Sequence, residues 1–405
     1  MTGASGFDWG SAALDTLWWI AKAFVVTSVI FLIVVAVVLR TTTWGRQFWR
    51  ISGGFFTGRQ SWAAWLMLAA NMLSAVCTVR MTVLFTYQTN DMYSAIQFIV
   101  QALAGHEQAV LHQEIHLFWV SIQVFVVLAA IWVFLRLFAI WVTQVFVIRW
   151  WRWLNGHVTE DWLTGKAYYR NRFIDSTIDN PDQRIQQDVS DFVHGSYAMA
   201  FGGDVGGGYS VTAGGAVGSG LAVVSFIPVL WSLSPPLTLF GLTIPRGLTF
   251  VTFVYLVLGS AIAFWAGHPL IRINFWIQRR TADFRYALVR FRENAESIAL
   301  YHGEQVERVN LVSRFGALIV VYWRWVYRTI GFNGVNLGLS QIDTLFPIVI
   351  LAPFVFSGKM TIGQIQQAAS AFSSMEAGAS MPRDSYDAFT YYRSTLVRLD
   401  GMITA

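Results

Sequence analysis

The chain has 405 residues, of which 55% are hydrophobic, 16% aromatic and only 13% charged. Soluble domains carry about 25% charged residues, so a soluble chain of this length could not cover its surface with so few charges. This composition excludes a soluble multidomain enzyme and indicates a protein that crosses a membrane several times. The single cysteine, Cys77, excludes an internal disulfide framework and a thiolate metal cluster.

Six apolar runs are each long enough to cross the roughly 30 Å hydrocarbon layer of a bilayer. They are Leu17–Leu39, Trp62–Tyr87, Leu117–Ile148, Val211–Leu233, Leu248–Leu270 and Thr329–Phe356. The first run is preceded by Asp8 and Asp15 instead of the basic residues of a signal peptide. We therefore expect it to be an uncleaved helix.

A seventh segment, Thr361–Tyr392, has a helical pattern but many polar side chains. Its apolar residues recur at three- and four-residue spacing and form one stripe. Ionised groups in hydrocarbon cost several kcal/mol each, so this segment is either a soluble tail or a helix that lines a water-filled cavity, and we favour the cavity. The candidate cavity or proton-path residues are Gln364, Gln367, Glu376, Arg383, Asp384 and Asp387, together with Asp343 in the sixth run and Arg80 in the second.

Basic residues concentrate in three stretches, which lie between the first and second runs, after the third and after the fifth. By the positive-inside rule these stretches are cytosolic, which places the N-terminus outside and the C-terminus in the cytosol. The net charge of +5 thus reports membrane topology and does not indicate nucleic-acid binding. We expect an extra N-terminal span and an interfacial helix in residues 1–60. A six-helix region, 61–405, would follow with cytosolic excursions at 149–205 and 271–325.

Each excursion contains one motif. In the first, Asn180-Pro181-Asp182-Gln183-Arg184 joins a helix-capping asparagine to a proline that suits the first helical position. This order predicts a short surface helix. In the second, the helical pattern around Glu296 and Tyr301 is interrupted by Gly303, which indicates a turn.

Together the two motifs resemble those of the membrane half of ABC transporters of the peroxisomal fatty-acyl half-transporter subfamily and its bacterial relatives. Residues 180–184 match the first motif fully. The second motif matches at Glu296, Ile298, Ala299, Tyr301 and Gly303, and departs at Ser297, Leu300 and His302. The motifs also resemble those of the BacA-type ABC importers of mycobacteria.

That resemblance implies an all-α, exporter-like (type IV) fold of about seven spans per protomer and a homodimer in the bacterial cytoplasmic membrane. It also implies uptake of hydrophilic solutes such as cobalamin, antimicrobial peptides and hydrophilic antibiotics through a large polar cavity. The two motifs would then couple the chain to an ATPase. A transporter is therefore the favoured class, ahead of a membrane-embedded enzyme or a receptor scaffold.

Two energy sources remain open. The sequence has no Gly-x-x-x-x-Gly-Lys-Ser/Thr loop, so ATP and Mg are expected only through an ATP-binding domain, fused to the chain or associated with it. The full match of the first motif favours this interpretation. The alternative is a stand-alone, proton-driven peptide transporter of the SbmA/BacA type, in which buried carboxylates bind and release protons.

Other polar residues carry less information. Arg80 and Arg136 lie within the second and third runs, where they would bind anionic substrate groups or pair with Glu376 or Asp384. Two histidines before the third run have i, i+4 spacing but no further ligand motif. We therefore predict neither a metal site nor a catalytic site in this chain.

Overall fold

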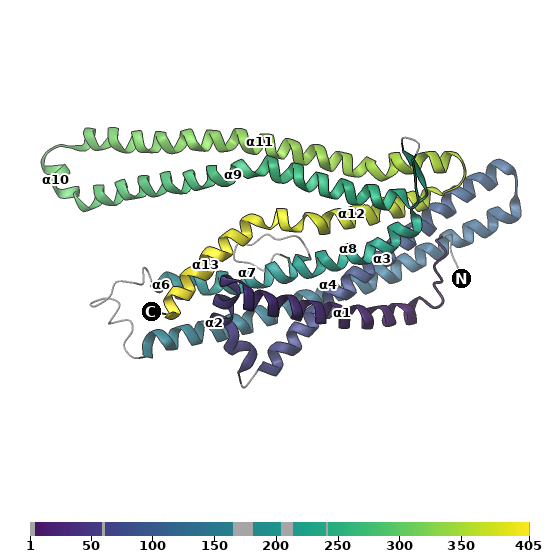
Figure 1. Cartoon of the computed structure of the whole chain (residues 1–405), viewed down its shortest axis with the longest axis horizontal. Coiled ribbons are helices and arrows are strands. Elements are labelled where there is room, and N and C mark those ends of the chain that lie inside the picture. The colour runs from purple at the N-terminus through teal and green to yellow at the C-terminus, as the bar shows by residue number, and fades with distance from the viewer. Residues whose placement is uncertain (1–4, 59–60, 165–180, 204–213, 240–241, 405) are drawn as a thin grey trace. The chain divides into compact units, whose positions relative to one another are not determined.

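The protein is almost entirely helical, as Figure 1 shows. The computed structural model describes residues 5–58, 61–164, 181–203, 214–239 and 242–404. Six of its helices are long and apolar enough to cross a membrane: α1 (Ala12–Thr41), α3 (Ser61–Gly105), α4 (Gln108–Leu163), α8 (Gly215–Leu233), α9 (Gly247–Glu293) and α11 (Glu304–Phe356). Five of the apolar runs lie wholly within these helices, and the fourth run does so from Gly215 onward, so the expectation of an all-α membrane fold is confirmed. Two three-residue strands, β1 (Leu237–Leu239) and β2 (Leu242–Ile244), form an antiparallel hairpin between α8 and α9.

The helices form two compact units. The first comprises residues 1–252 and 347–405, and the second comprises residues 253–346. The second unit is a long helical hairpin, in which parts of α9 and α11 are joined at the tip by the short helix α10 (Ala295–Leu300). The first unit contains the other helices, including α12 (Ile362–Asp384) and α13 (Tyr386–Thr404).

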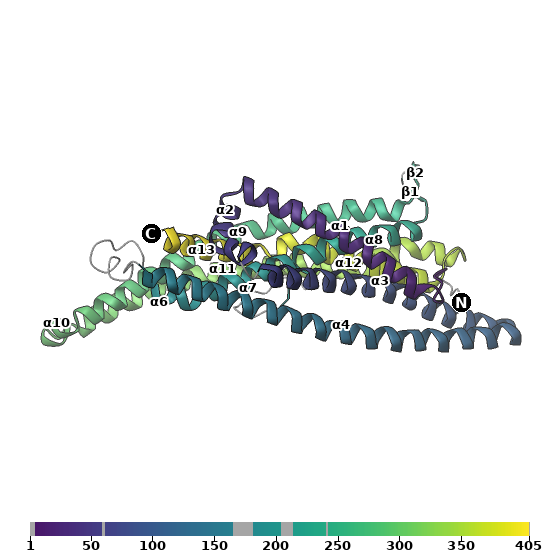
Figure 2. The same cartoon turned by 90° about the horizontal axis from the view of Figure 1, so that it is seen from below.

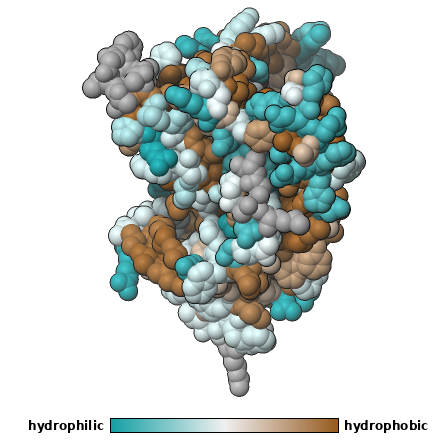
Figure 3. All heavy atoms as spheres, turned by 90° about the vertical axis from the view of Figure 1, so that its right-hand side faces the viewer, coloured by the Kyte–Doolittle hydropathy of each residue, from teal (hydrophilic) through white to brown (hydrophobic). Residues whose placement is uncertain are grey.

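Much of the surface of the first unit is apolar. Helix α1 has no buried residue, and its large side chains, such as Ile30 and Ile33, are exposed. The end-on view in Figure 3 likewise shows hydrophobic side chains that lie open on the surface beside hydrophilic ones. Exposing such a surface to water costs free energy, whereas contact with lipid chains does not.

Helices α3 and α4 lie side by side in both views (Figures 1 and 2). The 56 residues of α4 span roughly 84 Å at the helical rise per residue, so α4 extends well beyond a bilayer core. Near its C-terminal end, aromatic rings from α2 (Thr43–Thr57), α4 and α7 (Val189–Phe201) form the main core cluster. Phe55 stacks on Trp150, and the Trp150 indole donates to the Ser52 hydroxyl at 3.2 Å.

The predicted seventh helix is two helices in the structure. Sequence periodicity predicted one continuous helix from Thr361 to Tyr392, but α12 ends at Asp384 and α13 begins at Tyr386. Pro382 lies in the last turn of α12 and cannot donate a backbone hydrogen bond. The chain turns at Ser385, whose backbone N–H donates to the carbonyls of Met381 and Arg383. Helix α12 packs against α3 and α8, and α13 packs against α2 and α7.

Two glycines allow α12 to approach its neighbours closely. A Cβ at Gly363 would collide with the Asn90 carbonyl oxygen on α3. A Cβ at Gly378 would lie 2.7 Å from the Ser219 carbonyl oxygen on α8. Small residues commonly allow such close backbone contact between membrane helices.

We therefore expect Gly378→Ala to destabilise the protein by about 1–3 kcal/mol, because overpacking forces neighbouring helices apart. The matched control is Gly220→Ala on α8, where an added Cβ has no atom within 4 Å and alanine improves helix propensity. Thermal unfolding in nanodiscs measures both variants. Equal midpoints for the two would contradict this packing argument.

Candidate functional site

The first motif begins a helix that rests on the C-terminal helix α13. Asn180 lies outside the described residues, and Pro181 opens the short helix α6 (Pro181–Gln183). A π-helical segment, Arg184–Asp188, follows and leads into α7. Its Ile185 carbonyl accepts a hydrogen bond from the Asn155 amide of α4 at 3.1 Å. π-Helical turns are rare and occur often at functional sites.

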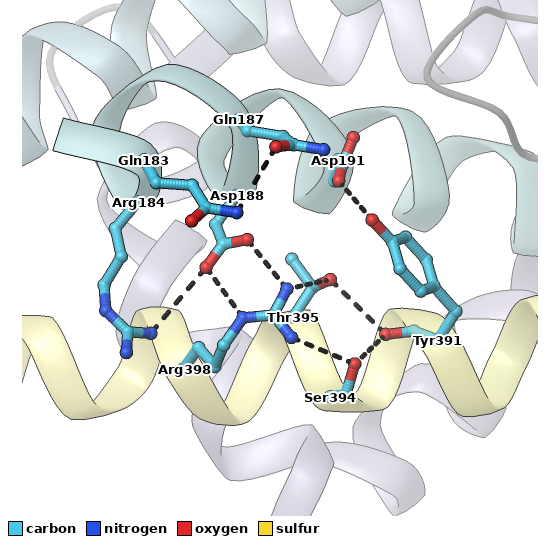
Figure 4. Close-up of polar contacts among 9 residues, drawn as sticks. All are labelled: Gln183, Arg184, Gln187, Asp188, Asp191, Tyr391, Ser394, Thr395 and Arg398. Atoms are coloured by element: carbon cyan, nitrogen blue, oxygen red, sulfur yellow. Dashed lines mark hydrogen bonds and ion pairs between the residues drawn. The ribbon is translucent and has the colours of Figure 1, made fainter. Parts of the chain in front are cut away.

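Asp188 is the central group of this junction (Figure 4). Its carboxylate side chain is only 4% exposed, so it needs partners within the protein. Arg398 of α13 binds both carboxylate oxygens, with Nη2 at 2.7 Å from Oδ1 and Nε at 2.9 Å from Oδ2. Arg184 approaches the same carboxylate, with Nη1 at 3.7 Å from Oδ2. A bidentate arginine–carboxylate pair is a strong and geometrically specific contact.

A second contact lies two turns before Arg398 on α13. The Tyr391 hydroxyl donates to Asp191 Oδ2 at 2.7 Å. Burial disfavours the charged phenolate, and the hydrogen bond to Asp191 stabilises the neutral phenol, so the pKa of Tyr391 rises to about 12. The hydrogen bonds from Arg398 to the Asp188 carboxylate likewise raise the pKa of Arg398.

Helix α13 is also tied to α2. The Arg50 Nη1 lies 3.1 Å from Asp400 Oδ1, and the Gln47 amide donates to Asp400 Oδ2 at 3.1 Å. The C-terminal helix is therefore held by polar contacts to two other elements, and the motif-bearing segment is one of them. Sequence reasoning missed Asp188, Arg398 and Asp400, because each pairs with a residue far away in the chain.

The second motif lies at the hairpin tip of the second unit. Tyr301 follows α10 directly and is 86% exposed, and Leu300 is 72% exposed. Glu296 is exposed on α10. His302 has φ of 53°, and the Gly303 N–H donates to the Ile298 carbonyl at 2.9 Å. A residue with positive φ is uncommon unless it is glycine, and His302 stands where the resembling motif has glycine.

The first unit also contains an open cavity of about 580 Å³, bordered by α3, α4, α7, α8 and α12. Cavities of this size hold small ligands in other proteins. Its described lining includes the polar side chains of Asn71, Thr78, Arg136, Thr143, Tyr197 and Ser374. Helix α12 contributes Ser374 and Gly378 to the wall.

The cavity residues predicted from the sequence lie elsewhere. Gln364 forms a capping box with Thr361 at the start of α12, and the buried Gln367 accepts a hydrogen bond from Asn90 at 2.7 Å. Arg383 pairs with Asp384 at 2.9 Å. The remaining three are Glu376, half-buried on α12, Asp387, exposed on α13, and Asp343, on α11 in the second unit. The described lining of the 580 Å³ cavity includes none of these residues, so their part in transport stays a prediction.

Arg80 is bound to α1. Its Nη2 donates to Thr16 Oγ1 at 3.2 Å, and its guanidinium lies 5.2 Å from the centre of the Trp19 ring. Thr16 is therefore the partner of Arg80, in place of the suggested Glu376 or Asp384. The segment before α1 is held to the same helix α3, because Asp91 accepts a hydrogen bond from the Trp9 indole at 2.8 Å.

We expect Arg398→Gln to weaken the hold on α13, because the buried Asp188 keeps only the longer contact to Arg184. Losing hydrogen bonds to a charged group costs about 1.5–3 kcal/mol. Hydrogen exchange of the α13 amides measures the local opening free energy. Arg393→Gln is the matched control, since Arg393 is exposed on the same helix. Unchanged α13 protection in Arg398→Gln would show that the pair does not hold the helix.

The Tyr391 phenol provides a pH test of the same junction. Its folded pKa lies above that of a free phenol, near 10, so its contribution to stability is complete below pH 10. This contribution is lost as the pH rises through about 12. The difference in phenolate absorbance between wild type and Tyr391→Phe should titrate near 12, and Asp191→Asn should move that midpoint downward. A wild-type midpoint near 10 would rule out the Tyr391–Asp191 hydrogen bond.

Comparison with known proteins identifies the chain's family. The chain is 33% identical over 360 residues to an uncharacterized ABC transporter ATP-binding protein of Haemophilus influenzae, covering 89% of this chain and 56% of that protein. It is 28% identical over 362 residues to the chloroplastic ABC transporter D family member 2 of Arabidopsis thaliana, covering 88% and 45%. It is 24% identical over 221 residues to the human lysosomal cobalamin transporter ABCD4, covering 53% and 32%.

The chain thus spans less than two thirds of the length of these relatives. Its residues 51–356, most of the chain, match the family described as ABC transporter transmembrane region 2. Together with the six membrane-spanning helices, this match shows that the chain belongs to the ABC transporter transmembrane region 2 family, of the subfamily D type.

Proposed function

We propose that the chain is the membrane half of an ATP-driven transporter that takes up hydrophilic solutes, with cobalamin, antimicrobial peptides and hydrophilic antibiotics as the candidates. It would act as a homodimer in the bacterial cytoplasmic membrane, with the N-terminus outside and the C-terminus in the cytosol. The distribution of basic residues supports this orientation. Residues 1–60 would add one span and an interfacial helix to the six-helix region 61–405.

The exposed hairpin tip carries this proposal. Two large apolar side chains, Leu300 and Tyr301, stand side by side at the far end of the second unit, and both are more than two-thirds exposed. Adjacent apolar side chains on an exposed tip favour a partner that covers them. An ATP-binding domain is the partner that fits, and it would bind the ATP and Mg.

The first motif also presents exposed side chains, which here are polar. Asp182 and Gln183 are exposed on α6, while Arg184 is half-buried against Asp188. Asp182 is therefore free to contact a partner, whereas Arg184 also holds the junction with α13. We infer that movement of α6 would pass through the Asp188–Arg398 pair to α13, and from there through Ser385 to α12.

The names of the relatives support ATP as the energy source and, more weakly, cobalamin as a solute. The Haemophilus influenzae relative is named as an ATP-binding protein, and the human relative is named as a cobalamin transporter. The alternative energy source is the proton gradient, because α12, which packs against the long apolar helices α3 and α8, carries the half-buried carboxylate Glu376.

Uptake into proteoliposomes tests the proposal. The protein is purified with any ATP-binding domain that it carries, and uptake of cobalamin and of a hydrophilic peptide is followed with and without ATP. We expect uptake to require ATP and to persist when a protonophore is added. Uptake that proceeds without ATP and stops with the protonophore would instead establish the proton-driven alternative.

The same assay locates the coupling surface. Tyr301→Ala and Asp182→Asn should each lower solute-stimulated ATP hydrolysis several-fold while leaving solute binding intact. Tyr286→Ala is the matched control, because Tyr286 is 66% exposed on the shaft of the same hairpin. Normal coupling in both motif variants would remove the two motifs from the ATPase contact.

A further inference from the structure

The cavity of the first unit has one charged side chain in its described lining. This is Arg136 on α4, which lies within the apolar run Leu117–Ile148. Its side chain is exposed, and it makes no hydrogen bond or ion pair with any described residue. An arginine at membrane depth is costly and usually serves a ligand or an ion path. The described lining contains no carboxylate to neutralise Arg136.

The hydroxyl groups that α3 contributes to the cavity wall already donate hydrogen bonds within the helix. Ser74, Thr78 and Thr82 lie on one face of α3 and line the cavity. Each hydroxyl donates to the backbone carbonyl four residues earlier, at 2.9, 2.8 and 3.0 Å respectively. A hydroxyl has one proton and two lone pairs, so these oxygens can only accept hydrogen bonds from a solute.

Three further polar groups of the wall, on Asn71, Thr143 and Tyr197, contact one another. The Tyr197 hydroxyl donates to Asn71 Oδ1 at 2.7 Å, and the Thr143 hydroxyl lies 3.1 Å from the same oxygen. The Asn71 amide nitrogen donates to the Met67 carbonyl at 2.9 Å. Arg136, with five N–H donors in a planar fork, therefore remains the strongest unused donor of the described lining.

We propose that this cavity binds its solute through an oxyanion, a carboxylate or a phosphate, held by the Arg136 guanidinium. The solute's own N–H or O–H groups face the hydroxyl oxygens of α3. The planar fork of arginine matches both oxyanions, and binding supplies the negative charge that the cavity wall lacks. This inference rests on the proposed function and specifies the solute class of the same cavity.

Equilibrium binding in nanodiscs without ATP tests the inference with matched probes. Radiolabelled triglycine is compared with triglycine amide, and glycerol phosphate is compared with glycerol. At least one of the two acids should bind about tenfold or more tightly than its neutral partner, as expected for hydrogen bonds to a charged group. The two pairs separate a carboxylate preference from a phosphate preference, and a preference in either pair supports the inference. Equal binding of acid and neutral probe in both pairs, or no binding of any probe, would overturn it.

Variants then assign the preference to one residue. Arg136→Gln should abolish the discrimination between acid and neutral probes, and Arg136→Lys should keep part of it. Arg152→Gln is the control, because Arg152 is exposed on the same helix and is not among the described lining residues. A preference that survives Arg136→Gln would overturn the assignment. ATP-dependent uptake without an acid preference would refute this inference alone, whereas an acid preference without ATP-dependent uptake would refute only the proposed function.

Discussion

The buried carboxylate of Asp188 constrains the arrangement of the first unit. A buried ion is costly unless it is paired and hydrogen-bonded, and Arg398 supplies that pairing through two short hydrogen bonds. If helix α13 left this position, the Asp188 carboxylate would keep only the longer contact to Arg184. Tyr391 and Asp400 add further contacts along α13, so the helix is fixed against both α7 and α2.

The cavity depends on the same chain of contacts. Helix α12 ends at the Ser385 turn, which leads directly into α13, and it approaches its neighbours closely because Gly363 and Gly378 have no side chain. It contributes Ser374 and Gly378 to the cavity wall. A displacement of the motif-bearing segment would therefore reach this wall through one ion pair and one turn. Pro382, in the last turn of α12, lies next to this connection between α12 and α13.

Sequence reasoning recovered the elements that depend on local pattern. The described residues of the six apolar runs lie in helices, apart from Gly214 at the start of α8, because apolar length is a direct physical requirement for crossing a bilayer. The helix start at Pro181 also follows from local chemistry. The turn at Ser385 was missed, although Pro382 was a visible signal, because the apolar stripe continued across it.

The polar contacts could not be predicted in the same way. Asp188 and Arg398 are separated by 210 positions, and no local pattern indicates such a pair. Gln367 looked like a cavity residue because it is polar, yet Asn90 satisfies it in a buried contact between α3 and α12. In the sequence, Arg136 and Arg80 look alike, because each lies within an apolar run. In the structure, Thr16 of α1 binds Arg80, whereas Arg136 makes no hydrogen bond or ion pair with a described residue.

The central claim is that the first motif and α13 move as one body. The distance between spin labels at Gln183 on α6 and Val397 on α13, both exposed, tests this claim. The labels are attached to cysteines introduced at these two positions, in a variant whose only native cysteine, Cys77, is replaced. Pulsed electron paramagnetic resonance should give the same narrow distance distribution with and without ATP in the otherwise wild-type protein. In Arg398→Gln the distribution should be broader. A wild-type distance that shifts with ATP, or an unchanged distribution in Arg398→Gln, would contradict the account.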